Sequence, residues 1–158
     1  MPAPIVIDVD PRQLRAAQLR LAPATFLVAM RAGMNESTQY LKGEVQQLMP
    51  VNNGLARGSV FAEVRGATIA GLYGITASPL EYVSVLEWGR RPGAPPPPVA
   101  AIQAWAARTL GDGSRGTAFV IARAIGRRGL PAHHMFSEAA RRGLGTVARI
   151  FTRHLRGL

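Results

Sequence analysis

Cysteine is absent from the chain, which excludes a disulfide scaffold, a thiolate metal site and a thiol nucleophile. Lysine occurs once, at Lys42, and only 9 of the 158 residues are Asp or Glu. No apolar run reaches the roughly 18 residues that a membrane-spanning helix requires, so we expect no membrane partner. The segment MPAPIVIDVD has no basic region before its short apolar run and therefore lacks the pattern of a secretory signal. We expect synthesis in the cytoplasm.

Arginine is abundant instead, and it is concentrated toward the C-terminus. The formal net charge is +10, and residues 115–158 contain nine arginines against one acid, Glu138. Such a basic half predicts an acidic neighbour, which is either nucleic acid or a complementary protein surface. A solvated basic face without a partner is the third possibility. Hydrophobic residues make up 47% of the chain, enough for the core of one domain of this length.

The spacing of apolar residues predicts an α+β fold with a long N-terminal amphipathic helix. Residues 5–9 form a β-branched run typical of an edge strand, and residues 10–21 can form a short helix. The long helix is expected over residues 23–49 and ends at the proline that follows. Gly33 and Gly43 are expected to weaken it. Its apolar face has residues spaced three, four or seven apart: Leu27, Met30, Met34, Leu41, Val45 and Leu48.

A small antiparallel sheet is expected to follow the long helix and to pack against it. Residues 52–54 predict a tight turn. Residues 59–64 and 68–75 predict two paired strands, and Gly71 and Gly74 suggest a bulge or a close backbone approach in the second strand. The segment 81–88 fits either a strand or a short helix.

Helices are predicted for the C-terminal part. Residues 89–98 form a loop whose four consecutive prolines favour an extended, stiff connector. Helices are expected over residues 99–110 and 117–127, and Ser137 is expected to cap a last helix that extends toward Arg156. The single domain thus has four parts, which are an N-terminal arm with a short helix (1–22), the long helix (23–49), the sheet with the proline-rich loop (50–98) and the helical C-terminal part (99–158).

The last helix is predicted to be amphipathic with a basic face. One stripe is apolar and consists of Leu144, Val147, Phe151 and Leu155. A separate stripe consists of Arg142, Arg149, Arg153 and Arg156.

The residue patterns that support catalysis are missing. No serine lies in a G-x-S-x-G turn, and neither G-x-x-x-x-G-K-[ST] nor a G-x-G-x-x-G that follows a strand occurs. His133 and His134 are adjacent on a loop and point in different directions, so we expect a buried or packing pair rather than metal ligands. Glu81 and Glu87 lack a neighbouring histidine or second acid, which favours a structural role. We expect no catalytic residues, no metal, no cofactor and no enzymatic activity. An enzyme whose site is shared between subunits is left open, without residues that support it.

Sequence-independent DNA binding is the main alternative function. The arginine stripe of the last helix could lie along phosphates, and such contacts would be sensitive to salt. Phe136 and Phe151 supply the only aromatic surface nearby, and both are expected in the core. No helix-turn-helix, zinc finger or stacking sheet is evident in the sequence.

Several short segments follow one another in an order that matches a known family. The long helix leads into PVNNGLARGSV, which fits a P-V-x-x-G-x-L-x-x-S turn at Pro50, Val51, Gly54 and Ser59, with Leu55 one position before the leucine of the pattern. A strand pair rich in glycine comes next, and then YVSVLEWGRR, which fits a Y-A-x-x-x-E-x-G corner at Tyr82, Glu87, Gly89 and Arg90. Val83 replaces the usual small residue of this corner, and Trp88 replaces a common phenylalanine. The segments AIQAWAAR and AFVIARAIGRRGLPAHHMFSEAARR follow the proline-rich loop. Over about residues 26–153, the chain resembles the tail-completion or neck proteins of long-tailed bacteriophages.

The resemblance implies a structural virion protein made in the cytoplasm of a host bacterium. Relatives of this kind form a homo-oligomeric ring, commonly hexameric, that joins the head connector or adaptor to the tail-tube proteins as a neck, tail-completion or tail-terminator ring. Contacts between subunits would lie at Tyr82, Glu87, Trp88, Arg90 and Arg91, and Glu87 would pair with an arginine of its own or a neighbouring subunit. The basic face formed by Arg142, Arg149, Arg153 and Arg156 would meet either packaged DNA or an acidic partner ring.

Overall fold

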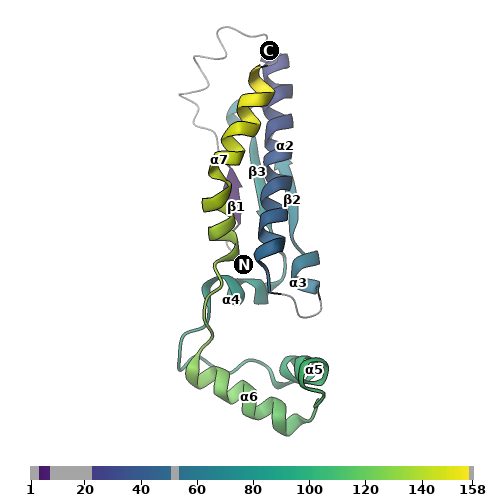
Figure 1. Cartoon of the computed structure of the whole chain (residues 1–158), viewed down its shortest axis with the longest axis vertical. Helices are drawn as coiled ribbons and strands as arrows, with labels where there is room; N and C mark the ends of the chain where they lie inside the picture. The colour runs from purple at the N-terminus through teal and green to yellow at the C-terminus, as the bar shows by residue number, and fades with distance from the viewer. Residues whose placement is uncertain (1–3, 8–22, 51–53, 157–158) are drawn as a thin grey trace. The chain divides into compact units, whose positions relative to one another are not determined.

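The computed structural model of the chain describes residues 4–7, 23–50 and 54–156. They belong to two compact units, the first formed by Met1–Val83 with Met135–Leu158 and the second by Ser84–His134. The fold class is α+β, with a long helix on a three-stranded antiparallel sheet followed by C-terminal helices, which confirms the prediction (Figure 1). The expectation of one domain with the four parts given above stays a prediction.

The sheet of the first unit contains β1 (Ile5–Ile7), β2 (Phe61–Arg65) and β3 (Tyr73–Ala77) in the order β1-β3-β2. Both pairs are antiparallel, and Ile75 lies opposite Val6 on one side and Glu63 on the other. The expected edge strand is therefore confirmed over the residues that the structure describes.

The second predicted strand begins later than expected. Residues expected to pair from position 68 instead form the short 3-10 helix η1 (Ile69–Gly71), which the Thr68 side chain caps by accepting from the Gly71 N–H. Gly71 belongs to that turn and not to a bulge. A further short helix, α3 (Leu55–Gly58), precedes β2. The expected helix over residues 10–21 and Asn52 and Asn53 of the expected turn lie outside the described residues.

The helix α2 (Pro23–Leu48) is the central element of the first unit and has the predicted bounds to within one residue. It packs on the sheet and runs antiparallel to α7 (Met135–Arg156), as Figure 1 shows. The core is formed by Phe26, Met30, Met34 and Leu72, and the partly buried side chains around it are Ile7, Val64, Ile69, Phe151 and Leu155.

Three glycines allow these elements to approach closely. A Cβ atom at Gly143 of α7 would lie 2.6 Å from Leu41 Cδ2 of α2, and one at Gly33 of α2 would lie 3.0 Å from Phe151 Cδ1 of α7. A Cβ at Gly74 of β3 would collide with Thr38 of α2. Gly33, expected only to weaken the helix, is therefore a packing position. A larger side chain there would have to displace Phe151 of α7.

Two details of the last helix differ from the prediction. The helix begins at Met135, so Ser137 lies inside its first turn and not at the N-cap position. Leu144, assigned to the apolar stripe, is 70% exposed. The buried positions of α7 are Met135, Phe136, Ala139, Gly143 and Ile150, so the packing face includes two small residues that a search for large apolar side chains overlooks.

The second unit contains the end of α4 (Glu81–Trp88), α5 (Val99–Leu110) and α6 (Arg115–Arg128). The ambiguous segment 81–88 is thus a helix, and α5 has the bounds that the sequence predicts. α6 begins two residues before its predicted start, because Ser114 caps it by accepting from the Thr117 N–H. α5 and α6 pack against each other, and the buried positions of the two helices are the small residues Ala106, Ala118, Ala122 and Gly126.

Two connecting segments of the second unit lie against each other in extended backbone. The Arg90 and Leu130 backbones exchange two hydrogen bonds of 2.9 Å, and the His133 N–H donates to the Leu86 carbonyl. Gly89 has a positive φ of 72°, and a Cβ there would lie 2.6 Å from the Leu130 carbonyl oxygen. Glycine is therefore required at this corner by both the backbone angle and the space.

Gly143 and Gly145 of α7 provide a matched test of the helix packing. Alanine at Gly145, which has no neighbour within 4 Å, should raise the free energy of unfolding by up to about 1 kcal/mol through helix propensity. Alanine at Gly143 gains the same propensity but must displace Leu41, so it should be less stable than Gly145→Ala by about 1–3 kcal/mol. Urea unfolding measures both. Equal stabilisation by the two substitutions would contradict the close packing of α2 and α7.

Candidate DNA or partner interface

The predicted arginine stripe lies on the exposed surface of α7. Arg142, Arg149, Arg153 and Arg156 are spaced seven, four and three residues apart, which places them on one face of the helix. All four residues are exposed. The structure therefore brings the predicted residues together, but it gives them different surroundings.

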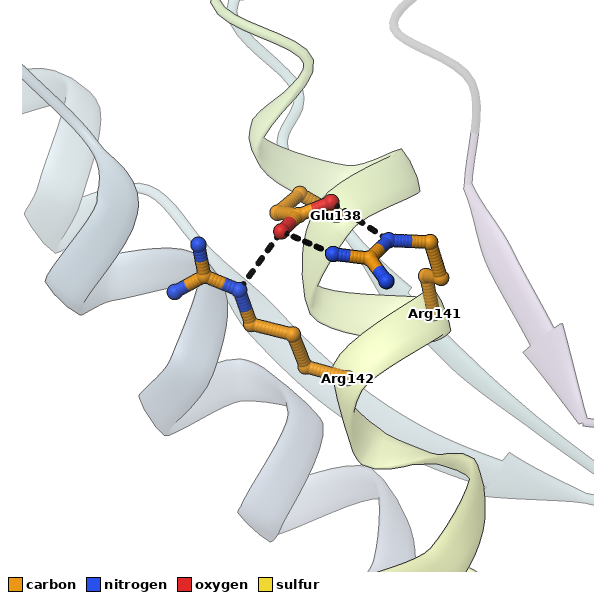
Figure 2. Close-up of polar contacts among 3 residues, drawn as sticks. All are labelled: Glu138, Arg141 and Arg142. Atoms are coloured by element: carbon orange, nitrogen blue, oxygen red, sulfur yellow. Dashed lines mark hydrogen bonds and ion pairs between the residues drawn. The ribbon is translucent and has the colours of Figure 1, made fainter.

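At the N-terminal end of the stripe, Glu138 holds two arginines (Figure 2). The Arg141 guanidinium donates to both carboxylate oxygens at 2.6 and 2.8 Å, and Arg142 Nε donates to Oε1 at 2.6 Å. Hydrogen bonds from Arg141 and then Arg142 lower the pKa of Glu138 from 4.5 to about 2. Arg142 is thus partly neutralised by its own helix.

At the other end, an acid from α2 joins the two long helices. Glu36 accepts from the Arg153 guanidinium, and its second oxygen lies 2.8 Å from His154 Nε2. The hydrogen bond from Arg153, followed by that from His154, lowers the pKa of Glu36. Arg153 therefore contributes to the contact between α2 and α7 and is not a free cation.

Arg149 and Arg156 are the stripe residues that remain available. Within the described residues, neither has a carboxylate within 4 Å, and Arg149 donates to the Thr146 hydroxyl at 2.9 Å. Together with Thr152 and Arg153 they line an open surface hollow of about 450 Å³. Guanidinium groups at such a place can bind phosphate or carboxylate oxygens, but they stay protonated and cannot act as acid or base at neutral pH.

The residues around α4 that are expected to contact another subunit differ from one another in their exposure to solvent. Tyr82 and Trp88 are 45% and 57% exposed, and Arg91 is exposed, so these side chains can reach a partner. Partial desolvation raises the pKa of the Tyr82 hydroxyl. Glu87, in contrast, is completely buried. Its carboxylate belongs to the interior of the chain, so the surface contact proposed for it from sequence is not supported by its position.

Arg90 braces the proline-rich loop and does not extend into solvent. Its guanidinium donates to the Pro95 carbonyl, and the Gly93 N–H donates to the Gly126 carbonyl of α6 at 2.8 Å. A Cβ at Gly126 would lie 3.3 Å from Pro96. The loop therefore rests on α6 of the same unit, which gives it a structural role consistent with a stiff connector.

The sequence predicts a buried or packing pair of histidines. Burial is wrong, since His133 and His134 are both exposed, and their backbone N–H groups donate to carbonyls at the end of α4. Packing holds for His134, whose ring meets the edge of Trp88 with centroids 6.2 Å apart. Across residues 4–7, 23–50 and 54–156, no group of three or more His, Asp or Glu side chains is arranged to hold a metal ion.

Sequence reasoning missed an exposed apolar and basic face on α6. Phe119 and Val120 are 53% and 65% exposed, and Arg123 and Arg127 follow them on the same side of the helix. The signal was present in the spacing of Ala118, Ala122 and Gly126, which recur every four residues. Such a row of small residues marks the buried face of the helix. The large residues next to them in the sequence therefore lie on other faces of the helix.

Comparison of the chain with protein-family models, with curated proteins and with solved structures found no match in any of the three. Among the helices of the described residues, none combines the length and the apolar character that crossing a bilayer demands.

The Glu138 cluster predicts how stability changes in acid. Its pKa is lower in the folded chain, so its stabilising effect is present above pH 4.5 and is lost as the pH falls toward about 2. We expect wild type to be more stable than Glu138→Gln at neutral pH, with the difference vanishing near pH 2. Urea unfolding of both proteins across this range measures it. A difference independent of pH would mean that the ion pairs contribute nothing.

Proposed function

We propose that the protein is a structural component of a tailed phage or phage-like particle, and that it forms a ring at the head–tail junction. The proposal draws on the ordered resemblance of residues 26–153 to neck and tail-completion proteins and on the α+β fold that this resemblance implies. In this role the protein acts through shape and contact, as a homo-oligomer between the head connector and the tail-tube proteins.

The corner around α4 supports an assembly role. Two of its motif residues hold the chain in place, since Glu87 is buried and Gly89 adopts a backbone angle that suits glycine. Trp88 and Arg91 instead face outward. Tryptophan and arginine are the residue types most enriched among the side chains that dominate protein interfaces. The exposed Trp88 is the single observation that carries the proposal.

Native mass spectrometry and electron microscopy of the purified protein test this role. We expect a closed ring, and Trp88→Ala should shift the distribution toward monomers because the interface loses its largest exposed aromatic side chain. Arg108→Ala on α5 is a matched control that should leave assembly unchanged. A protein that stays monomeric at every concentration and is absent from purified particles would overturn the proposal.

Sequence-independent DNA binding is the second candidate, and Arg149 and Arg156 favour it. Both are exposed cations without a carboxylate neighbour in the described part of the chain. In a ring they would face packaged DNA, and in an isolated protein they would bind duplex DNA of any sequence.

A double substitution separates the two roles of α7. Replacing Arg149 and Arg156 with serine removes two phosphate contacts but keeps the Arg153–Glu36 pair, so the fold should persist. The slope of log affinity for duplex DNA against log salt should become shallower by about 2, which fluorescence anisotropy can measure. Arg108→Ser is the control for a general change in charge. An unchanged slope would show that this face does not contact DNA.

A further inference from the structure

The second unit buries no large apolar side chain. Within residues 84–134, all of which the structure describes, the buried positions are Glu87, Ala106, Ala118, Ala122, Gly126 and Gly129. Trp105, Ile121 and Ile125 are only partly buried, and Trp88, Leu110, Phe119, Val120 and Leu130 are exposed. An α-helical hairpin gains most of its stability from burying such side chains. Much of the apolar surface of α5 and α6 is therefore left to be covered by something else.

One face of α6 combines the exposed apolar side chains with positive charge. Phe119 and Val120 lie next to each other, Arg123 follows one turn later, and Arg127 follows one turn after that. Gly116, one turn before Val120, has no neighbour within 4 Å and leaves space beside these side chains. An apolar centre with a charged margin is the usual composition of a protein interface.

No negative charge of the unit is available to balance this face. α6 contains four arginines and no acid. Of the two acids in residues 84–134, Glu87 is buried, and Asp112 accepts from the Thr117 hydroxyl at 2.5 Å and from the Ser114 N–H at 2.8 Å. The charges of the face must therefore be balanced by ions or by a partner.

We propose that this α6 face, formed by Phe119, Val120, Arg123 and Arg127, docks an acidic segment of another protein that presents aliphatic or aromatic side chains between its carboxylates. Its apolar residues would cover Phe119 and Val120, and its carboxylates would meet the two guanidinium groups, for which bidentate pairing is favourable. The inference does not depend on the proposed function, since it uses side chains outside the resemblance's expected contacts.

Two other occupants fit this face less well. The phosphate backbone of DNA would meet the arginines but would leave Phe119 and Val120 in water. A second copy carries a net charge of +10, and three of its nine acids, Glu36, Glu63 and Glu138, are already paired with arginines of the same chain. Like-charged surfaces repel each other at close range.

Selection of a displayed library of random peptides against the full-length protein tests the proposal. We expect enriched peptides to be acidic and to contain aliphatic or aromatic residues. Fluorescence anisotropy with one such synthetic peptide should show binding that weakens about tenfold or more in Phe119→Ser/Val120→Ser. Arg123→Ala/Arg127→Ala should weaken binding and reduce its dependence on salt. Arg128→Ala, on the same helix but away from this face, should bind as wild type does.

Each alternative outcome contradicts the proposal. Enriched peptides that are not acidic, or that bind the serine variant unchanged, would place the docking surface elsewhere. Duplex DNA that binds more tightly than the peptide and loses affinity only in the arginine variant would identify a phosphate-binding face. Self-association that the serine variant abolishes, measured by sedimentation, would identify a second copy as the occupant. Circular dichroism of each variant confirms that exposed substitutions leave the fold intact.

Discussion

The close approach of α2 to α7 and to β3 is the constraint on which the first unit depends. Glycine stands at three of the contact points, Gly33, Gly143 and Gly74, where an added Cβ atom would crowd a side chain of the neighbouring element. This contact brings Phe26, Met30, Met34 and Leu72 into one core. It also brings Glu36 of α2 within reach of Arg153 and His154 of α7, which adds a polar link between the two helices. A dense interior of this kind tolerates little change in volume.

The arginines that look alike in sequence divide into separate groups because of this packing. Arg142 and Arg153 are held by Glu138 and Glu36, whereas Arg149 and Arg156 lie free of carboxylates in the described residues and can meet an anion. In the second unit, Arg90 supports the proline-rich loop, but Arg123 and Arg127 remain on an open face with Phe119 and Val120. The first unit thus has a core and a basic edge. The second unit has small-residue contacts and an apolar surface suited to a partner, which agrees with a protein that works through assembly.

Sequence predicted the features that local chemistry determines. Helix lengths followed from apolar spacing and from the prolines at residues 50 and 98, and the fold class followed from the order of helix, strands and helices. Contacts between residues that are far apart in the chain could not be predicted from the sequence. Gly33 and Gly43 look the same in sequence, yet only Gly33 touches another helix. The Arg153–Glu36 pair joins residues 117 positions apart, so no local pattern reveals it. The burial of Glu87 and the exposure of Leu144 are likewise set by packing and not by residue type.

The first unit holds the buried apolar core, and we propose that the second unit relies on a partner to cover its apolar surface. Native-state hydrogen exchange of the isolated protein tests it most directly, because the slowest amides report the largest free energies of opening. The account predicts that amides of α2, α7 and β3 exchange together as the slowest set, and that those of α5 and α6 exchange through an opening of lower free energy. Protection of α5 and α6 equal to that of α2 in the isolated protein would contradict it.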